Sequence, residues 1–259
     1  NISQVSQNIL TVIFGRIFPV KTVGNFTQGW KWNNMASSFV SGMLAQVAQP
    51  VFASIQHEEN RQLHILRKMT RFTAFLVFPA MFGLIIIAPE FIVLLISDKW
   101  IDSVPILQIL CISGAFIPIY LPMQQLIVSQ GRSDIFMWVN IAQLILQIGV
   151  ILIFARQGII AMVTAYSAFI VLWTIAWQIF TKKIVDYSFL ALLKDIMPFL
   201  LAALAACAIA YAVAVLLPGM LLRMVVKILI AVILYVTVMQ IAGAHVMKEC
   251  IGYLRHRYR

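Results

Sequence analysis

Long apolar stretches alternate with short polar segments along the whole of this 259-residue chain. The pattern predicts eight apolar spans, at about 2–18, 35–55, 72–96, 104–128, 135–154, 159–180, 196–217 and 222–242. Each span is close in length to the roughly 20 residues that an α-helix needs to cross the hydrocarbon core of a bilayer. The polar segments at about 21–34 and 97–103 are expected to be turns, and segment 57–71, whose Leu63, Leu66 and Thr70 recur at helical spacing, a short surface helix.

The composition supports helices in a membrane. Hydrophobic residues make up 62% of the chain, charged residues 11%, and the mean hydropathy is +0.95, whereas a soluble domain is about 45–50% apolar. A backbone surrounded by lipid must satisfy its own hydrogen bonds, and these spans are too long and too evenly apolar for barrel strands. The predicted fold class is therefore all-α: a polytopic membrane helical bundle with about eight transmembrane helices.

The net charge of +10 would suggest a nucleic-acid partner in a soluble protein. Here the basic residues lie between apolar spans, so we interpret them as topology signals and expect no nucleic-acid partner. If the C-terminal tail is cytoplasmic, twelve of the 19 Lys and Arg residues, including Arg67 and Arg71, fall on the inner side and seven, including Lys227, on the outer side. This bias predicts a multi-pass membrane protein with a cytoplasmic C-terminus.

The polar residues form no catalytic or metal-binding motif. The four His residues lie in polar segments without partners at metal-ligand spacing, and the three Cys residues are far apart. There is no P-loop and no nucleophile elbow. All nine acidic residues fall at loops or span ends, so no buried carboxylate is predicted that could couple transport to protons or sodium. We expect no enzyme activity, no metal and no cofactor.

An ordered set of short motifs covers about half of the chain. The set consists of Val23-Gly24-Asn25-Phe26, Pro50-Val51-Phe52 followed by Ile55-Gln56, Leu94-Leu95-Ile96-Ser97-Asp98-Lys99-Trp100, Pro105-Ile106-Leu107-Gln108-Ile109-Leu110 and Gly131-Arg132-Ser133-Asp134. In this order the motifs resemble the oligosaccharide flippases (Wzx-like), the polysaccharide transporter branch of the multidrug, oligosaccharidyl-lipid and polysaccharide exporter superfamily. Ser97 departs from the Gly that is more usual in that family.

The resemblance implies a two-lobed transporter, of which this chain is the second, C-terminal half. Residues 1–181 would form the second transporter lobe, with about six transmembrane helices. Residues 182–259 would add two further transmembrane helices and a basic cytoplasmic tail. The N-terminal lobe of the same protein, which this chain lacks, would be a partner.

The resemblance also implies a function. It is the translocation of an undecaprenyl-diphosphate-linked oligosaccharide across the bacterial inner membrane, for lipopolysaccharide, capsule or exopolysaccharide biosynthesis. Alternating access fits this task, with two lobes rocking about a central cavity. The partners would be the lipid-linked oligosaccharide (a polyprenyl diphosphate), membrane lipids and the polysaccharide polymerase machinery.

Asn8 and Arg16 on the first span are candidates for lining the cavity between the lobes. The resemblance places this span beside a cationic cavity, and the planar fork of an Arg binds phosphate oxygens in pairs. Arg16 also lies near a span end, where an Arg can reach the membrane surface as a simple anchor, and this second interpretation is favoured.

Two further spans carry polar residues that line the cavity or bond to neighbouring helices. On the second span the resemblance favours a cavity wall, whereas on the fifth span, where the residues share one helical face, helix contacts are favoured. These candidates are Ser37, Ser41, Gln46 and Gln49 on the second span, and Asn140, Gln143 and Gln147 on the fifth.

Other functions stay open. A multidrug or cation antiporter of the same superfamily would need a buried carboxylate, and a flippase for the peptidoglycan precursor would differ only in its substrate. A membrane-embedded polysaccharide polymerase or ligase predicts a large outer loop, whereas the loops here are short. A purely structural membrane subunit would tolerate substitution of Asn8, Arg16 and Gln46.

Overall fold

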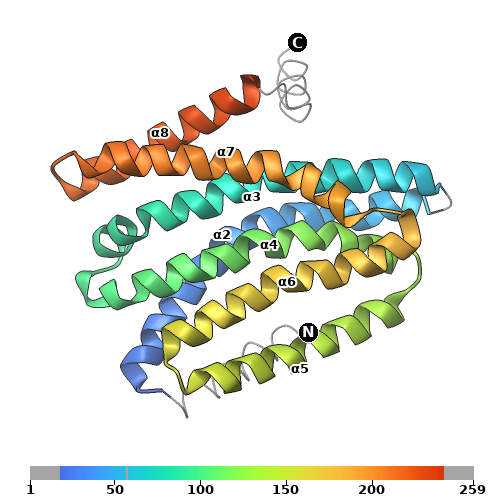
Figure 1. The fold of residues 1–259 in the computed structure, drawn as a ribbon, viewed down its shortest axis with the longest axis horizontal. Coiled ribbons are helices and arrows are strands. Elements are labelled where there is room, and N and C mark those ends of the chain that lie inside the picture. The colour runs from blue at the N-terminus through green and yellow to red at the C-terminus, as the bar shows by residue number, and fades with distance from the viewer. Residues whose placement is uncertain (1–17, 57, 242–259) are drawn as a thin grey trace.

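In a computed structural model, the protein is a bundle of long helices that run side by side (Figure 1). The structure describes residues 18–56 and 58–241. In this part of the chain the elements are α2 (Val20–Ser54), α3 (Glu59–Leu95), the short 3₁₀ helix η1 (Asp98–Ser103), α4 (Val104–Ser129), α5 (Ser133–Ala155), α6 (Ile159–Val185), α7 (Phe189–Val215) and α8 (Met220–Ile241). They include no strand, and the predicted all-α fold class is confirmed.

Six helices of the described part are long and apolar enough to cross a membrane: α3, η1 with α4, and each helix from α5 to α8. The predicted polytopic bundle is therefore confirmed, although not its number of eight spans. The first predicted span lies outside the described residues. The second falls within α2, which carries Lys21, Lys31 and many amide and hydroxyl side chains and is not among the six.

The turn predicted at 21–34 is wrong, because these residues form the first half of α2. The helix has 35 residues and a length of roughly 52 Å. Its two glycines in this segment serve close packing instead of a turn. A Cβ on Gly29 would lie 3.1 Å from the backbone nitrogen of Leu107 on α4, and a Cβ on Gly24 would lie 3.2 Å from the Trp100 ring.

The helix predicted at 57–71 exists, but it is not a separate surface element. It is the beginning of α3, which runs for 37 residues, roughly 55 Å. No Pro or Gly interrupts residues 59–78, so the helix propagates directly into the apolar stretch. Because the hydrocarbon core is only about 30 Å thick, the polar first turns of α3 extend beyond it.

The core lies around α4, which is in contact with α2, α3, α5 and α6. Small and hydroxyl residues let these helices approach closely. Ser37 on α2 donates a hydrogen bond to the backbone oxygen of Gly114 at 3.1 Å, and Ser167 on α6 donates one to the backbone oxygen of Ile109 at 3.0 Å. A stripe of alanines, completely or almost completely buried, lines α7: Ala202, Ala203, Ala206, Ala210 and Ala214.

Helix α7 packs against α3 and α8, and α8 also contacts α3. Helix α7 begins at Phe189, two turns before the predicted span, and the Ser188 side chain caps it by accepting the Ala191 N–H. The polar pair Lys194-Asp195 interrupts the apolar pattern but not the helix. The reason is that the Asp195 side chain is neutralised by residues of α3.

Candidate functional site

Asn8 and Arg16 lie outside the described residues. The four candidates on α2 do not share one environment. Ser37 is buried against α4 through its hydrogen bond to Gly114, and Ser41 is half-buried. Gln46 and Gln49 are exposed, so only these two lie on the open side of α2.

The open side of α2 combines apolar and polar groups. Its apolar side chains are strongly exposed: Met35 at 62%, Phe39 at 71%, Met43 at 50% and Val47 at 53%. Gln46, Gln49 and Ser38 are exposed along the same helix. This open face is too apolar for water and more polar than the exposed sides of the six apolar helices.

The three candidates on α5 make local and interhelical contacts. Asn140 donates to the backbone oxygen of Phe136, one turn earlier, at 2.7 Å. Gln143 is half-buried near the Tyr120 hydroxyl of α4, and Gln147 is buried. Asn140 therefore bonds within its own helix, whereas Gln143 faces a neighbouring helix, as polar residues between membrane helices do.

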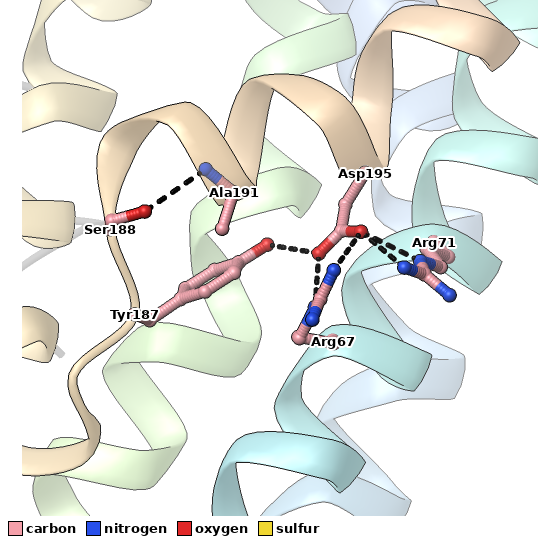
Figure 2. Close-up of polar contacts among 6 residues, drawn as sticks. All are labelled: Arg67, Arg71, Tyr187, Ser188, Ala191 and Asp195. Atoms are coloured by element: carbon pink, nitrogen blue, oxygen red, sulfur yellow. Dashed lines mark hydrogen bonds and ion pairs between the residues drawn. The ribbon is translucent and has the colours of Figure 1, made fainter.

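A cluster of charged side chains joins the beginning of α3 to the beginning of α7 (Figure 2). The Asp195 side chain on α7 is 1% exposed. Arg67 holds it with two hydrogen bonds, Nε to Oδ2 at 2.8 Å and Nη2 to Oδ1 at 3.0 Å. Arg71 donates Nε to Oδ1 at 2.8 Å and a second hydrogen bond from Nη2 to the same oxygen. Tyr187 donates its hydroxyl to Oδ2 at 3.0 Å.

The charges of this cluster do not cancel. One carboxylate faces two guanidinium groups, and Tyr187 adds no charge, because burial and the neighbouring Asp195 charge raise the pKa of its phenol. The side chains of Arg67 and Arg71 are 38% and 40% exposed, so the surplus positive charge lies at the surface of the bundle. Each guanidinium has five N–H donors, and the hydrogen bonds to Asp195 use only part of them.

A second ion pair joins α3 to α8. Lys227 Nζ contacts Glu90 Oε1 and donates to the backbone oxygen of Ile86 at 2.8 Å. The two side chains are 3% and 7% exposed, and Glu90 Oε2 is buried without a hydrogen-bond partner. Two predictions are therefore wrong: Glu90 and Asp195 are buried carboxylates, and Lys227 is not an outer-loop residue.

An apolar cavity of about 490 Å³ lies between α3, α7 and α8. It begins at Phe75, one turn after Arg71, and extends along α3 to Ile87, near the Lys227–Glu90 pair. Small residues leave the space open. The lining residues that matter below are Phe75, Gly83, Ala203, Ala206, Lys227 and Tyr235.

The two ion-pair clusters lie far apart on α3, one directly before its apolar stretch and the other about one turn before the helix ends at Leu95. Arg71 and Glu90 are 19 positions apart, which is about 29 Å along a helix. This separation matches the hydrocarbon thickness of about 30 Å. In the part of the chain described here, no three His, Cys, Asp or Glu residues lie close enough together to hold a metal ion.

Comparisons with known proteins agree with the motif order. Residues 2–105 match a family described as polysaccharide biosynthesis protein. The lipopolysaccharide biosynthesis protein WzxC of Escherichia coli (strain K12) is 25% identical over 59% of the chain and 31% of that protein. The chain is thus similar to polysaccharide biosynthesis proteins that include a Wzx protein. The resemblance stated from the sequence is confirmed.

Two other relatives agree with this relationship. The teichuronic acid biosynthesis protein TuaB of Bacillus subtilis (strain 168) is 24% identical over 72% of the chain and 36% of its own length. An uncharacterized membrane protein in the cps region of Klebsiella pneumoniae is 27% identical over 58% of the chain and 31% of its own length. The chain thus spans about a third of each relative. No solved structure matches it significantly.

Sequence reasoning missed the charged cluster of Arg67, Arg71 and Asp195. Arg67 and Arg71 were interpreted only as topology signals, although their i, i+4 spacing places them on one helical face. Asp195 lies in α7, 124 residues after Arg71. One signal in the sequence could have predicted this cluster: a single acidic residue, Asp195, at the edge of an apolar span, together with two arginines one helical turn apart.

Proposed function

We propose that this Wzx-like membrane protein takes part in polysaccharide biosynthesis as one lobe of a flippase. It translocates an undecaprenyl-diphosphate-linked oligosaccharide across the bacterial inner membrane and is not an enzyme. The relationship to WzxC and TuaB, whose names state lipopolysaccharide and teichuronic acid biosynthesis, supports this role. A charged headgroup crosses hydrocarbon only at a cost of several kcal/mol or more, so its passage needs a protein path.

The open face of α2 is the structural observation that supports the proposal. Against the described helices, α2 packs by one side, so its mixed face needs a second partner. The N-terminal lobe of the full-length protein is the partner we propose. Gln46 and Gln49 would then face the space between the lobes, where amides can bond to sugar hydroxyls during alternating access.

A cation antiporter of the same superfamily is the alternative that the structure favours most. Buried carboxylates, expected to be absent, are present as Glu90 and Asp195. Both are paired with basic side chains, and an ion pair of this kind holds helices together without any need to exchange a cation. Of the four carboxylate oxygens of Glu90 and Asp195, only Glu90 Oε2 lacks a hydrogen-bond partner. The experiment below therefore includes cation antiport as one of its outcomes.

Complementation of a flippase-null strain with the full-length gene tests the proposal. The wild type is expected to restore surface polysaccharide. Gln46→Leu with Gln49→Leu is expected to reduce it severalfold at matched membrane expression, because the amide groups are lost from the path. Thr164→Val is the matched control, since Thr164 is exposed on α6 and bonds only to its own helix, at the backbone oxygen of Ile160.

Two outcomes would contradict the proposal. A wild type that fails with several donor sugars but lowers the accumulation of a cationic drug would establish the antiporter instead. A wild type that complements fully with both Gln46 and Gln49 replaced would remove α2 from the substrate path.

A further inference from the structure

The Arg67–Arg71–Asp195 cluster has a net charge of +1, because two guanidinium groups face one carboxylate. Of the other described acidic side chains near this end, Glu58 pairs with Arg61 at 3.2 Å, and Asp134 lies 3.7 Å from Arg132. Asp186, directly before Tyr187, is exposed and offsets one positive charge. Lys182, Lys183 and Lys194 are exposed at the same end and add positive charge. The surface around Arg71 therefore attracts an anion.

The cluster lies at the depth where lipid phosphates are found. The apolar stretch of α3 begins directly after Arg71, and the helix extends for about three further turns on the polar side. Headgroups occupy the layer immediately outside the hydrocarbon core. The unused N–H donors of Arg67 and Arg71 thus lie in the layer that holds the phosphates of the nearest leaflet.

An apolar groove begins one turn deeper. Phe75 follows Arg71 by four residues and lines the cavity between α3, α7 and α8, so the two side chains share a helical face. The cavity extends from Phe75 to Ile87 along α3, about 18 Å. Its walls carry small residues of α7 and α8, among them Ala206 and Ala231. In a bilayer an apolar hollow is filled by hydrocarbon, because an empty one loses its packing contacts.

We propose that this is a binding site for one anionic phospholipid of the surrounding leaflet. The phosphate bonds to the guanidinium groups of Arg71 and Arg67, and one acyl chain lies in the groove. The single negative charge of a phosphodiester equals the surplus of the Arg67, Arg71 and Asp195 side chains themselves, whereas a diphosphate carries more. The site does not rest on the proposed flippase function, since it lies on α3, α7 and α8 and not on the open face of α2.

Native mass spectrometry of the full-length, delipidated protein tests this proposal by titration with phosphatidylglycerol. Arg71→Gln removes the surplus charge but leaves Asp195 paired with Arg67, and Gly83→Leu fills the groove without touching a charge. A Cβ on Gly83 has no atom within 4 Å, so the added side chain projects into open space. Each variant is expected to weaken phosphatidylglycerol binding about tenfold.

The chain offers a matched control for each variant. Arg132→Gln removes an exposed Arg at the turn between α4 and α5, and Gly149→Leu adds a side chain at an α5 position that also has no atom within 4 Å. Both controls should bind like the wild type, and phosphatidylcholine should bind at least tenfold more weakly. Unchanged binding in Gly83→Leu, equal binding of phosphatidylcholine, or displacement of phosphatidylglycerol from the site by an equal concentration of undecaprenyl diphosphate would overturn the proposal.

Discussion

Gly114 on α4 lies where α2 and α3 both come close to this helix. A Cβ at this position would overlap with the Asn33 side chain of α2 and the Met81 side chain of α3, both of which are completely or almost completely buried. The same residue accepts the Ser37 hydrogen bond through its backbone oxygen. The backbone at Gly114 is helical, a conformation that any residue adopts. Close packing, and not backbone conformation, is therefore what requires a glycine at this position.

Gly114→Ala is accordingly expected to destabilise the protein by about 1–3 kcal/mol, the usual cost of inserting a methyl group into a packed core. Gly149→Ala, at an open position of α5, is expected to be neutral or to stabilise by up to about 1 kcal/mol through helix propensity. Unfolding of the purified protein in a mild detergent, followed by circular dichroism, measures both. Equal effects of the two substitutions would show that Gly114 is not a packing constraint.

At the scale of elements, α3 organises this part of the fold through its two ends. Its first turns pair with Asp195 of α7, and its last turns pair with Lys227 of α8. Each ion pair satisfies a charge that would otherwise be isolated near or within the apolar region, and each connects helices that are distant in sequence. The two C-terminal helices are thus held to the rest of the bundle by charge as well as by the apolar contacts of α7.

The Lys227–Glu90 pair gives a test of this attachment. Lys227→Met leaves Glu90 buried without its cation and should cost on the order of 3–5 kcal/mol. Adding Glu90→Gln removes the isolated charge and should recover most of that loss. Detergent unfolding of the two single variants and the double variant measures the coupling, and protease cleavage at the turn around Gly219 reports whether α8 detaches. A double variant as unstable as the sum of the singles would show that the two side chains do not act as a pair.

The elements could be predicted from the sequence better than their connections. Apolar span length is a local property, and six of the predicted spans correspond to helices that can cross a membrane. The prediction of a turn at 21–34 was wrong because polar residues are not enough to end a helix. The segment contains two glycines but no proline, and α2 continues through it. The ion pairs could not be predicted from the sequence for another reason. Their partners are 137 and 124 residues apart, and no local pattern shows that a Lys in one span neutralises a Glu in another.

At the scale of the whole molecule, the structure changes the charge count that predicts orientation. The sequence count assigns Lys227 to the seven basic residues of the outer side, but its side chain is buried in an ion pair with Glu90. The cluster with Arg67 and Arg71 keeps its surplus charge at the opposite end, which also holds the exposed Arg132. The asymmetry between the two ends is therefore greater than the sequence count showed, and we predict that the Arg71 end faces the cytoplasm.

Labelling of single cysteines in intact cells tests this orientation. Cys111 and Cys207 are buried, and replacing Cys250 with Ser completes an unreactive background. Leu216→Cys, at a position 84% exposed next to the turn between α7 and α8, should react with a membrane-impermeant maleimide added outside. Ser133→Cys, exposed at the start of α5 near the Arg71 end, should react only after the membrane is opened. The reverse pattern would mean that the surplus charge of the Arg67–Arg71–Asp195 cluster faces the outer leaflet, and that the lipid bound there comes from that leaflet.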